Sequence, residues 1–245
     1  MNSTTHFLGV CRKTPVLIRA MISVGAIAAM TPTAMAAATT QVVTAFDTGW
    51  YEQQEGDFVL HVPENRNFVA GDANTPREWR SFFVFDLSAI HAPIQSAAFK
   101  AFVQPDGIGV SGLGQVETWT LFDVTTSIDD LLLGTSPNQT FQDLGSGAVL
   151  GSLNFSAAQR GTTVTVQLNS LAIDQLNAAG GRWAMGGAVT TRGPEAECIF
   201  HGSGEHSLAR LEITVPEPAG LSLALFASAA STSGFVRLRR PRPPI

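Results

Sequence analysis

Alternation of apolar and polar residues with a period of two runs through the middle of this 245-residue chain. In residues 162–168, Val164, Val166 and Leu168 share one side, and residues 207–215 alternate in the same way. A period of two is typical of a β-strand that has one face in the core and one in solvent. These segments therefore predict strands, which limits the chain to folds with half-buried sheets.

Residues 80–86 are apolar on both sides in their middle, so we predict a central strand there. Gly-, Pro- and Asn-rich breaks separate the remaining strand-like runs from one another. Those runs are residues 41–46, 57–62, 94–104, 115–124, 148–153, 182–186 and 197–201. Many short strands divided by turns predict an all-β fold, a β-sandwich, rather than an α/β enzyme fold.

Two short helices interrupt the strand pattern. Ser127 can cap a helix over residues 128–133, and Asn169 or Ser170 can cap a helix over 171–179 that ends at a glycine pair. We expect both helices to lie over sheet edges or over an open end of the sandwich.

Residues 1–36 have the composition of a secretory signal peptide with a helical core. Three basic residues precede an apolar run from 20 to 30, and Ala34 and Ala36 form a small-x-small cleavage pattern. We expect cleavage after Ala36, and therefore export. Cleavage removes Cys11 and leaves Cys198, so no disulfide can form within the mature chain, and Cys198 is expected to be a small buried core residue.

The C-terminal end has three parts in a fixed order. The tripeptide Pro216, Glu217, Pro218 comes first, a mostly apolar stretch of 17 residues (220–236) follows, and an arginine-rich tail ends the chain. Seventeen residues lie at the lower limit for a transmembrane helix, and the arginines favour the cytoplasmic side. This order predicts a membrane segment that leaves everything upstream outside the cytoplasm.

That order resembles the PEP-CTERM sorting signal of Gram-negative, exopolysaccharide-producing bacteria, over about the last 30 residues (216–245). The resemblance implies that exosortase, a membrane protease, recognises the tripeptide and releases the protein to the cell surface or matrix. The protein would then be only transiently anchored in the inner membrane. The alternative is a plain C-terminal anchor in which Pro-Glu-Pro occurs by chance.

The charge of the mature part is strongly negative. Residues 37–218 contain all 20 acidic residues and 8 of the 15 basic residues, a net charge of −12 against −5 for the whole chain. So acidic a surface repels nucleic acid and anionic membranes, which excludes nucleic acid as a partner. Residues 37–215 have the length of one domain with a sizeable core.

The domain also resembles secreted bacterial jelly-roll modules. Residues 80–88 and 94–99 match a recurring segment in which an R-x-F-x-x-F-D-L-S strand leads through a turn to an I-x-S-A-x-L strand. The similarity covers roughly residues 40–215. It implies a jelly-roll ectodomain like a carbohydrate-binding module, and it implies no reaction.

Flat aromatic side chains are the natural contacts for sugar rings, because they offer stacking area at little cost in entropy. Trp50 and Tyr51 follow a turn-like Asp47-Thr48-Gly49, so this pair is expected to be exposed and is the candidate carbohydrate-binding site. The alternative for Trp50 is a packing role at the rim. Trp79, Trp119 and Trp183 are further candidates, but Trp119 and Trp183 lie within predicted strands and are expected in the core.

Metal binding has two candidate locations. Asp86 follows a buried strand and could bind Ca2+ with a turn carbonyl, or it could accept hydrogen bonds from backbone N–H groups of its turn. His201 and His206 flank a loop with Glu205 and could hold a metal weakly, or they could be exposed loop residues. We expect no other cofactor.

A catalytic alternative depends on the carboxylates. Glycoside hydrolysis needs two carboxyl groups about 5–9 Å apart across one sugar. Glu52, Glu55, Asp57 and Glu64 cluster in one stretch, as do Asp129 and Asp130, but solvated acidic loops give the same pattern.

Together these patterns predict an exported, non-catalytic protein of the cell surface or of the exopolysaccharide (biofilm) matrix. Its role would be structural or adhesive, with weak polysaccharide contact. The rival from another class is a secreted glycoside hydrolase or other polysaccharide-active enzyme, and a third alternative is a spacer module that binds no ligand.

Overall fold

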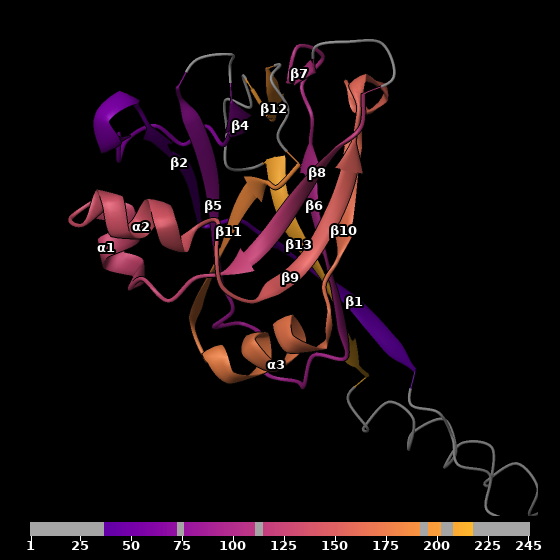
Figure 1. Ribbon diagram of the computed structural model, residues 1–245. Coiled ribbons are helices and arrows are strands. Elements are labelled where there is room, and N and C mark those ends of the chain that lie inside the picture. The colour runs from indigo at the N-terminus through magenta and orange to yellow at the C-terminus, as the bar shows by residue number, and fades with distance from the viewer. Residues whose placement is uncertain (1–36, 73–75, 111–114, 192–195, 202–207, 218–245) are drawn as a thin grey trace, which may run out of the picture. The chain divides into compact units, whose positions relative to one another are not determined.

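Two antiparallel sheets and three short α-helices make up the part of the chain that the computed structural model describes, residues 37–72, 76–110, 115–191, 196–201 and 208–217 (Figure 1). The predicted signal helix and the predicted membrane segment lie outside these residues. Within the described residues, no helix combines the length and the apolar character needed to cross a bilayer.

The smaller sheet has four strands in the order β1-β13-β6-β10. Their bounds are β1 Ala38–Thr44, β13 Ala209–Pro216, β6 Ser96–Phe102 and β10 Thr163–Gln167. In β13 the buried positions alternate strictly with half-buried ones, and Val164 and Val166 of β10 are buried between exposed neighbours. The predicted one-sided strands at 162–168 and 207–215 are therefore confirmed.

The larger sheet has nine strands and is centred on β5 (Glu78–Asp86) and β11 (Arg182–Val189). β2 pairs with β5 and β3, and the remaining strands follow the order β7-β12-β4-β5-β11-β8-β9. Their bounds are β2 Asp47–Gln53, β3 Val59–His61, β4 Ala70–Asp72, β7 Ile108–Val110, β8 Glu117–Asp123, β9 Val149–Phe155 and β12 Glu197–Ile199. β5 is the predicted central strand, and its middle is buried on both faces.

The main core lies between the two sheets and is rich in aromatic rings. Phe83 lies 4.7 Å from Phe99 of the opposite sheet, and Trp119 lies 5.0 Å from Phe200, measured between ring centroids. Trp119 and Trp183 are both buried, as predicted. Each large apolar side chain buried in this way contributes about 1.5–3 kcal/mol relative to exposure, so the interface between the sheets holds the fold together.

A second core lies on the outer face of the large sheet, under helices α1 (Ile128–Leu133) and α2 (Pro137–Asp143). Leu131 and Phe141 of these helices pack against Phe82 and Val84 of β5. Gly186 of β11 allows the close approach, because a Cβ atom there would lie 2.5 Å from the Leu144 carbonyl oxygen. Because α1 and α2 cover the outer face of the large sheet, β5 and β11 have no face that is open to solvent. We call these two helices the helical cover.

Two helices begin where the sequence predicts them. The Ser127 hydroxyl accepts a hydrogen bond from the Asp130 N–H and caps α1, and the Asn169 side chain caps α3 (Ser170–Ala179) through the Ala172 N–H. α3 packs Ala172 and Leu176 into the core between the sheets. The expected placement is wrong for α1, which covers a sheet face rather than an edge.

The sequence did not predict helix α2, so the prediction of only two short helices is wrong. Residues 134–138 looked like a break because they combine Gly, Ser, Pro and Asn. Ser136 followed by Pro137 instead places a proline at the first helical turn, where its missing N–H costs nothing.

Both ends of the described chain meet at one end of the small sheet. The Glu217 N–H donates to the Ala37 carbonyl at 2.8 Å, and Ala38 lies opposite Pro216. Every buried apolar residue of the described chain lies between Ala45 and Val215. Among the described residues, the segment 37–217 therefore contains both cores, and we expect it to fold alone.

Candidate functional site

Trp50 and Trp79 lie on the same face of the large sheet, on the paired strands β2 and β5. The register places Trp50 opposite Ser81 and Glu52 opposite Trp79. Residues two apart on a strand face the same way, so the two tryptophans are diagonal cross-strand neighbours. Both side chains are half-buried.

The two tryptophans line a pocket of about 340 Å³. Its other walls come from the loop before β4 and from the end of β12. The full lining is Trp50, Asn65, Asn67, Phe68, Val69, Trp79, Phe200 and His201. Among the described residues, the lining offers flat aromatic area, two amide side chains and one imidazole, and no carboxylate, ammonium or guanidinium. Such a lining suits a neutral polar ligand with an apolar face.

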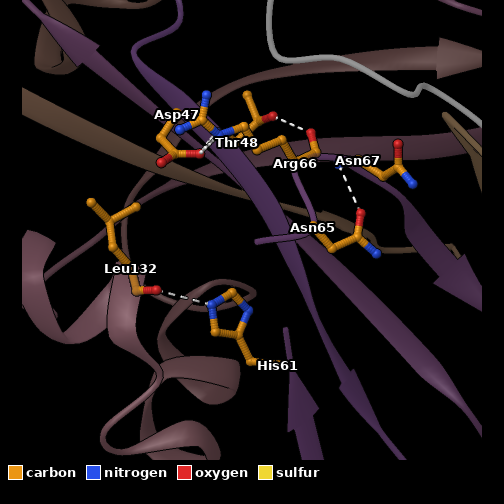
Figure 2. Close-up of polar contacts among 7 residues, drawn as sticks. All are labelled: Asp47, Thr48, His61, Asn65, Arg66, Asn67 and Leu132. Carbon is orange, nitrogen blue, oxygen red and sulfur yellow. Dashed lines mark hydrogen bonds and ion pairs between the residues drawn. The ribbon is translucent and has the colours of Figure 1, made fainter. Parts of the chain in front are cut away.

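The loop that carries Asn65 and Asn67 is fastened to the start of β2 (Figure 2). The Thr48 hydroxyl donates to the Arg66 carbonyl, and the Arg66 Nε lies 3.5 Å from the Asp47 carboxylate. The Asn65 side-chain oxygen accepts from the Asn67 N–H at 3.1 Å. These contacts hold both amides at the rim of the pocket.

Phe200 forms the inner end of the pocket in a backbone conformation that is unusual for its type. Its φ of +68° lies in the left-handed region, where a bulky residue is strained by about 1–3 kcal/mol. The buried ring packs against Phe68 and Trp119, and the following His201 N–H donates to the Gly107 carbonyl. The packing thus compensates the strain, and the turn brings exposed His201 to the pocket.

The prediction that Tyr51 is exposed beside Trp50 is wrong. Tyr51 is fully buried, its hydroxyl donates to the Leu131 carbonyl at 2.7 Å, and burial raises its pKa to about 12. Residues 47–53 form a strand, and Asp47-Thr48-Gly49 is part of it rather than a turn, so neighbouring side chains point to opposite faces. Trp50 faces the pocket, and Tyr51 faces the core beneath α1.

His61 connects this part of β2 to α1. Its ring is stacked on Tyr51 at 4.2 Å with a 6° interplanar angle. Its Nδ1 lies 2.9 Å from the Trp50 carbonyl oxygen. Its Nε2 lies 3.2 Å from the Leu132 carbonyl oxygen, as Figure 2 shows for the His61–Leu132 contact. The His61 ring therefore links the backbone of Trp50 to helix α1.

Of the candidate metal residues, Asp86 makes a hydrogen bond within its own turn. The Asp86 side chain accepts a hydrogen bond from the Ser88 N–H at 2.9 Å, and this bond lowers the pKa of the carboxyl group. Within the described ranges, no group of three or more His, Cys, Asp and Glu side chains is placed to hold a metal ion. Glu205 and His206 lie outside those ranges, and Cys198 is buried as predicted.

The acidic stretch around β2 is divided between two environments. Glu52 is buried and lies 3.4 Å from the Arg77 guanidinium. Glu55 and Asp57 instead line a separate hollow of about 350 Å³ together with Asp72 and Glu78, and Glu78 is paired with Arg80 at 2.8 Å. Glu64 is exposed, Asp130 lies in the first turn of α1, and neither Asp129 nor Asp130 lines this hollow.

The sequence indicated Trp50 and Trp79 as candidate aromatics but not that they lie side by side, and it did not indicate the other residues of the pocket. Trp79 precedes the predicted strand 80–86, and only the pairing of β2 with β5 reveals that it lies beside Trp50. Asn65, Asn67 and His201 carry no pattern in the sequence that links them to either tryptophan.

No protein-family model matches this chain, and no curated protein matches it.

Proposed function

We propose that this protein is an exported, non-catalytic component of the cell surface or extracellular matrix that holds neutral polysaccharide weakly in the pocket between Trp50 and Trp79. The observation that carries the proposal is the placement of these two half-buried indoles on one face, with Asn65 and Asn67 at the rim.

The chemistry of the pocket selects the class of sugar. Indole faces stack on the apolar C–H faces of pyranose rings, and the amides can donate to and accept from hydroxyl groups. No acidic or strongly basic side chain among the described residues lines the pocket, and residues 37–218 carry a net charge of −12. A neutral hexose polymer suits this environment better than a uronic acid polymer, which the surrounding charge repels.

The sorting part of the proposal rests on both ends of the chain. The tripeptide resembles a PEP-CTERM motif, and residues 1–36 have the pattern of a signal peptide. Ala37 and Glu217, the residues beside the two processing sites, are hydrogen-bonded neighbours. A domain whose ends lie together can be held at the membrane by either end. The two antiparallel sheets are compatible with the finer expectation of a jelly roll like that of a carbohydrate-binding module.

The binding proposal is tested with the segment 37–217 on an array of neutral and acidic glycans, with Ca2+ and with a chelator. We expect binding to a neutral glycan that Trp50→Ala and Trp79→Ala each weaken about tenfold, because each removes one stacking face. Phe58→Ala is the matched control, since Phe58 is 59% exposed on the β2–β3 hairpin but lies outside the pocket.

Three outcomes would contradict this proposal. Absence of binding to every glycan favours the spacer alternative. Equal loss in the Phe58→Ala variant shows that the pocket is not the site. Release of new reducing ends from a bound polysaccharide supports the glycoside hydrolase alternative.

The sorting proposal is tested in the native host with the full chain. Mass spectrometry of the exported wild-type protein should find a C-terminus near Pro218, whereas Glu217→Ala should retain the tail. If the wild-type protein keeps residues 237–245, exosortase processing at the tripeptide is wrong.

A further inference from the structure

The strand β1 (Ala38–Thr44) is an edge of the small sheet and pairs only with β13 among the described strands. Its sequence ATTQVVT contains no charged residue, no proline and no glycine. The register with β13 runs without interruption over all seven residues. β1 is thus a regular edge strand rich in β-branched residues, a combination that other strands can readily pair with.

The backbone groups on the open side can be assigned from the pairing. Ala45 N–H donates to the Ala209 carbonyl, and Ala37 accepts from the Glu217 N–H, so the odd-numbered residues of this strand face β13. The even-numbered residues Ala38, Thr40 and Val42 therefore direct their N–H and C=O groups to the open edge. Their side chains are exposed, Val42 by 57%.

The opposite edge of the same sheet is guarded. After β10, the Asn169 N–H donates to the Leu150 carbonyl and the Asn169 amide donates to the Val149 carbonyl, both on β9. Gly151 of β9 lies so close that a Cβ atom there would be 2.8 Å from the Gln167 carbonyl oxygen. Natural sheets protect edges with charges, prolines, bulges or covering segments, and β1 has none of these within the described residues.

The charge close to β1 is small, so the repulsion between two copies of this acidic protein is weakest along this edge. On the solvent face of the small sheet, Glu212 lies 2.6 Å from Lys100 and 3.7 Å from Arg210, and this group carries one net positive charge. The domain as a whole carries −12. Two copies that meet along β1 bring uncharged strands together and avoid close contact between carboxylates.

We propose that β1 pairs antiparallel with β1 of a second copy, so that two four-stranded sheets become one continuous sheet of eight strands. The arrangement is two-fold symmetric, with Thr40 near the axis and the outward backbone groups of each strand satisfied by the other. The contact is a single strand pair, so the dimer is weak and forms at micromolar or higher concentration. The pocket lies on the other sheet and is left open in both copies.

Sedimentation velocity of the segment 37–217 across about 1–500 µM tests the proposal. We expect a concentration-dependent dimer, and Thr40→Pro should raise its dissociation constant about 30-fold, because each copy loses one outward N–H. This proline keeps the fold, since the Thr40 N–H does not face β13. Thr40→Lys should also weaken the dimer, because two added charges face each other near the axis.

Thr165→Lys on β10 is the matched control, because it adds the same charge to an exposed threonine on the guarded edge. It should leave the dissociation constant unchanged. A wild-type segment that stays monomeric at 500 µM overturns the proposal, as does a dimer that Thr40→Lys leaves intact. If 37–217 dimerises but 37–245 does not, the C-terminal tail of the same chain occupies the edge, and pairing between copies is wrong.

Discussion

The two sheets of this protein use the same antiparallel pairing and differ in what covers their outer faces. The four-stranded sheet has one buried and one wet face, so its strands alternate, as β13 does at every position. The nine-stranded sheet is covered on its outer face by α1 and α2, and the middle of β5 is buried on both sides. Polar groups in the covered sheet therefore have to find partners, whereas those in the open sheet can rely on water.

Two ion pairs, one in each sheet, illustrate this difference in solvent exposure. In the open sheet, the side chains of Lys100 and Glu212 keep 25% and 28% of their surface exposed. In the covered sheet, those of Arg80 and Glu78 keep 11% and 13%. Arg80 also donates to the Phe141 carbonyl at 2.8 Å and lies over the Phe141 ring, which ties α2 to β5. The same kind of contact is peripheral in one sheet and structural in the other.

The largest expected effect is that of Arg80→Ala. It removes the salt bridge to Glu78, the hydrogen bond to the Phe141 carbonyl and the contact with the Phe141 ring, so α2 is held less firmly. We expect a loss of about 3–5 kcal/mol in the free energy of unfolding. Urea unfolding of the segment 37–217 measures it. Lys100→Ala is the control in the open sheet and should cost less than about 1 kcal/mol. Equal losses in the two variants would show that the helical cover does not separate the sheets energetically.

A smaller loss of stability is expected from Gly186→Ala, which tests how closely the end of α2 packs against β11. The added Cβ would lie 2.5–2.9 Å from backbone atoms of Leu144, so the end of α2 has to move, at a cost of about 1–3 kcal/mol. Gly181→Ala just before β11 is the matched control. Its nearest neighbour would be 3.9 Å away, and we expect no loss of stability. Thermal unfolding of both variants checks this, and a neutral Gly186→Ala would mean that the cover is loosely packed.

The smallest effect at neutral pH concerns Tyr51, the single tyrosine of the chain. Tyr51→Phe removes the hydrogen bond to the Leu131 carbonyl and should cost about 1 kcal/mol. Burial raises the pKa of the phenol to about 12, against about 10 in the unfolded chain. The stabilisation by this group is therefore complete below pH 10 and is lost as the pH rises from about 10 to about 12.

Absorbance near 295 nm follows this one phenol directly. We expect its ionisation to begin well above pH 10 in the folded protein and near pH 10 in urea. The Tyr51→Phe variant should show a flatter loss of stability above pH 10 than the wild type. A folded-state titration centred near pH 10 would mean that α1 does not cover Tyr51.

The features that could be predicted from the sequence differ between the two sheets for the same reason. In the open sheet, 162–168 and 207–215 could be assigned as one-sided strands because solvent imposes the period of two. In the covered sheet, 80–86 could be recognised as central because both of its faces are apolar. The helix caps Ser127 and Asn169 were predictable as well, since capping depends on neighbouring residues alone.

The errors arose where tertiary contacts override local pattern. Asp47-Thr48-Gly49 looks like a turn, but the segment becomes a strand because it pairs with β5, and Tyr51 is buried for that reason. The pocket needs the register between two strands and a loop held by the contact between Thr48 and Arg66. No local pattern encodes such a register, so Trp79, Asn65 and Asn67 could not be placed beside Trp50.

The position of β13 between β1 and β6 has a mechanical consequence. When a protein with this fold is tethered through its C-terminus, a force on the domain is transmitted through β13. This strand is paired with β1 over seven residues and with β6 over six. Such a pull along the strand loads these hydrogen bonds together, in shear. A force that separates Ala37 from Glu217 instead breaks the hydrogen bonds between β1 and β13 one after another. The domain should therefore withstand traction on its tail far better than force applied between its two ends.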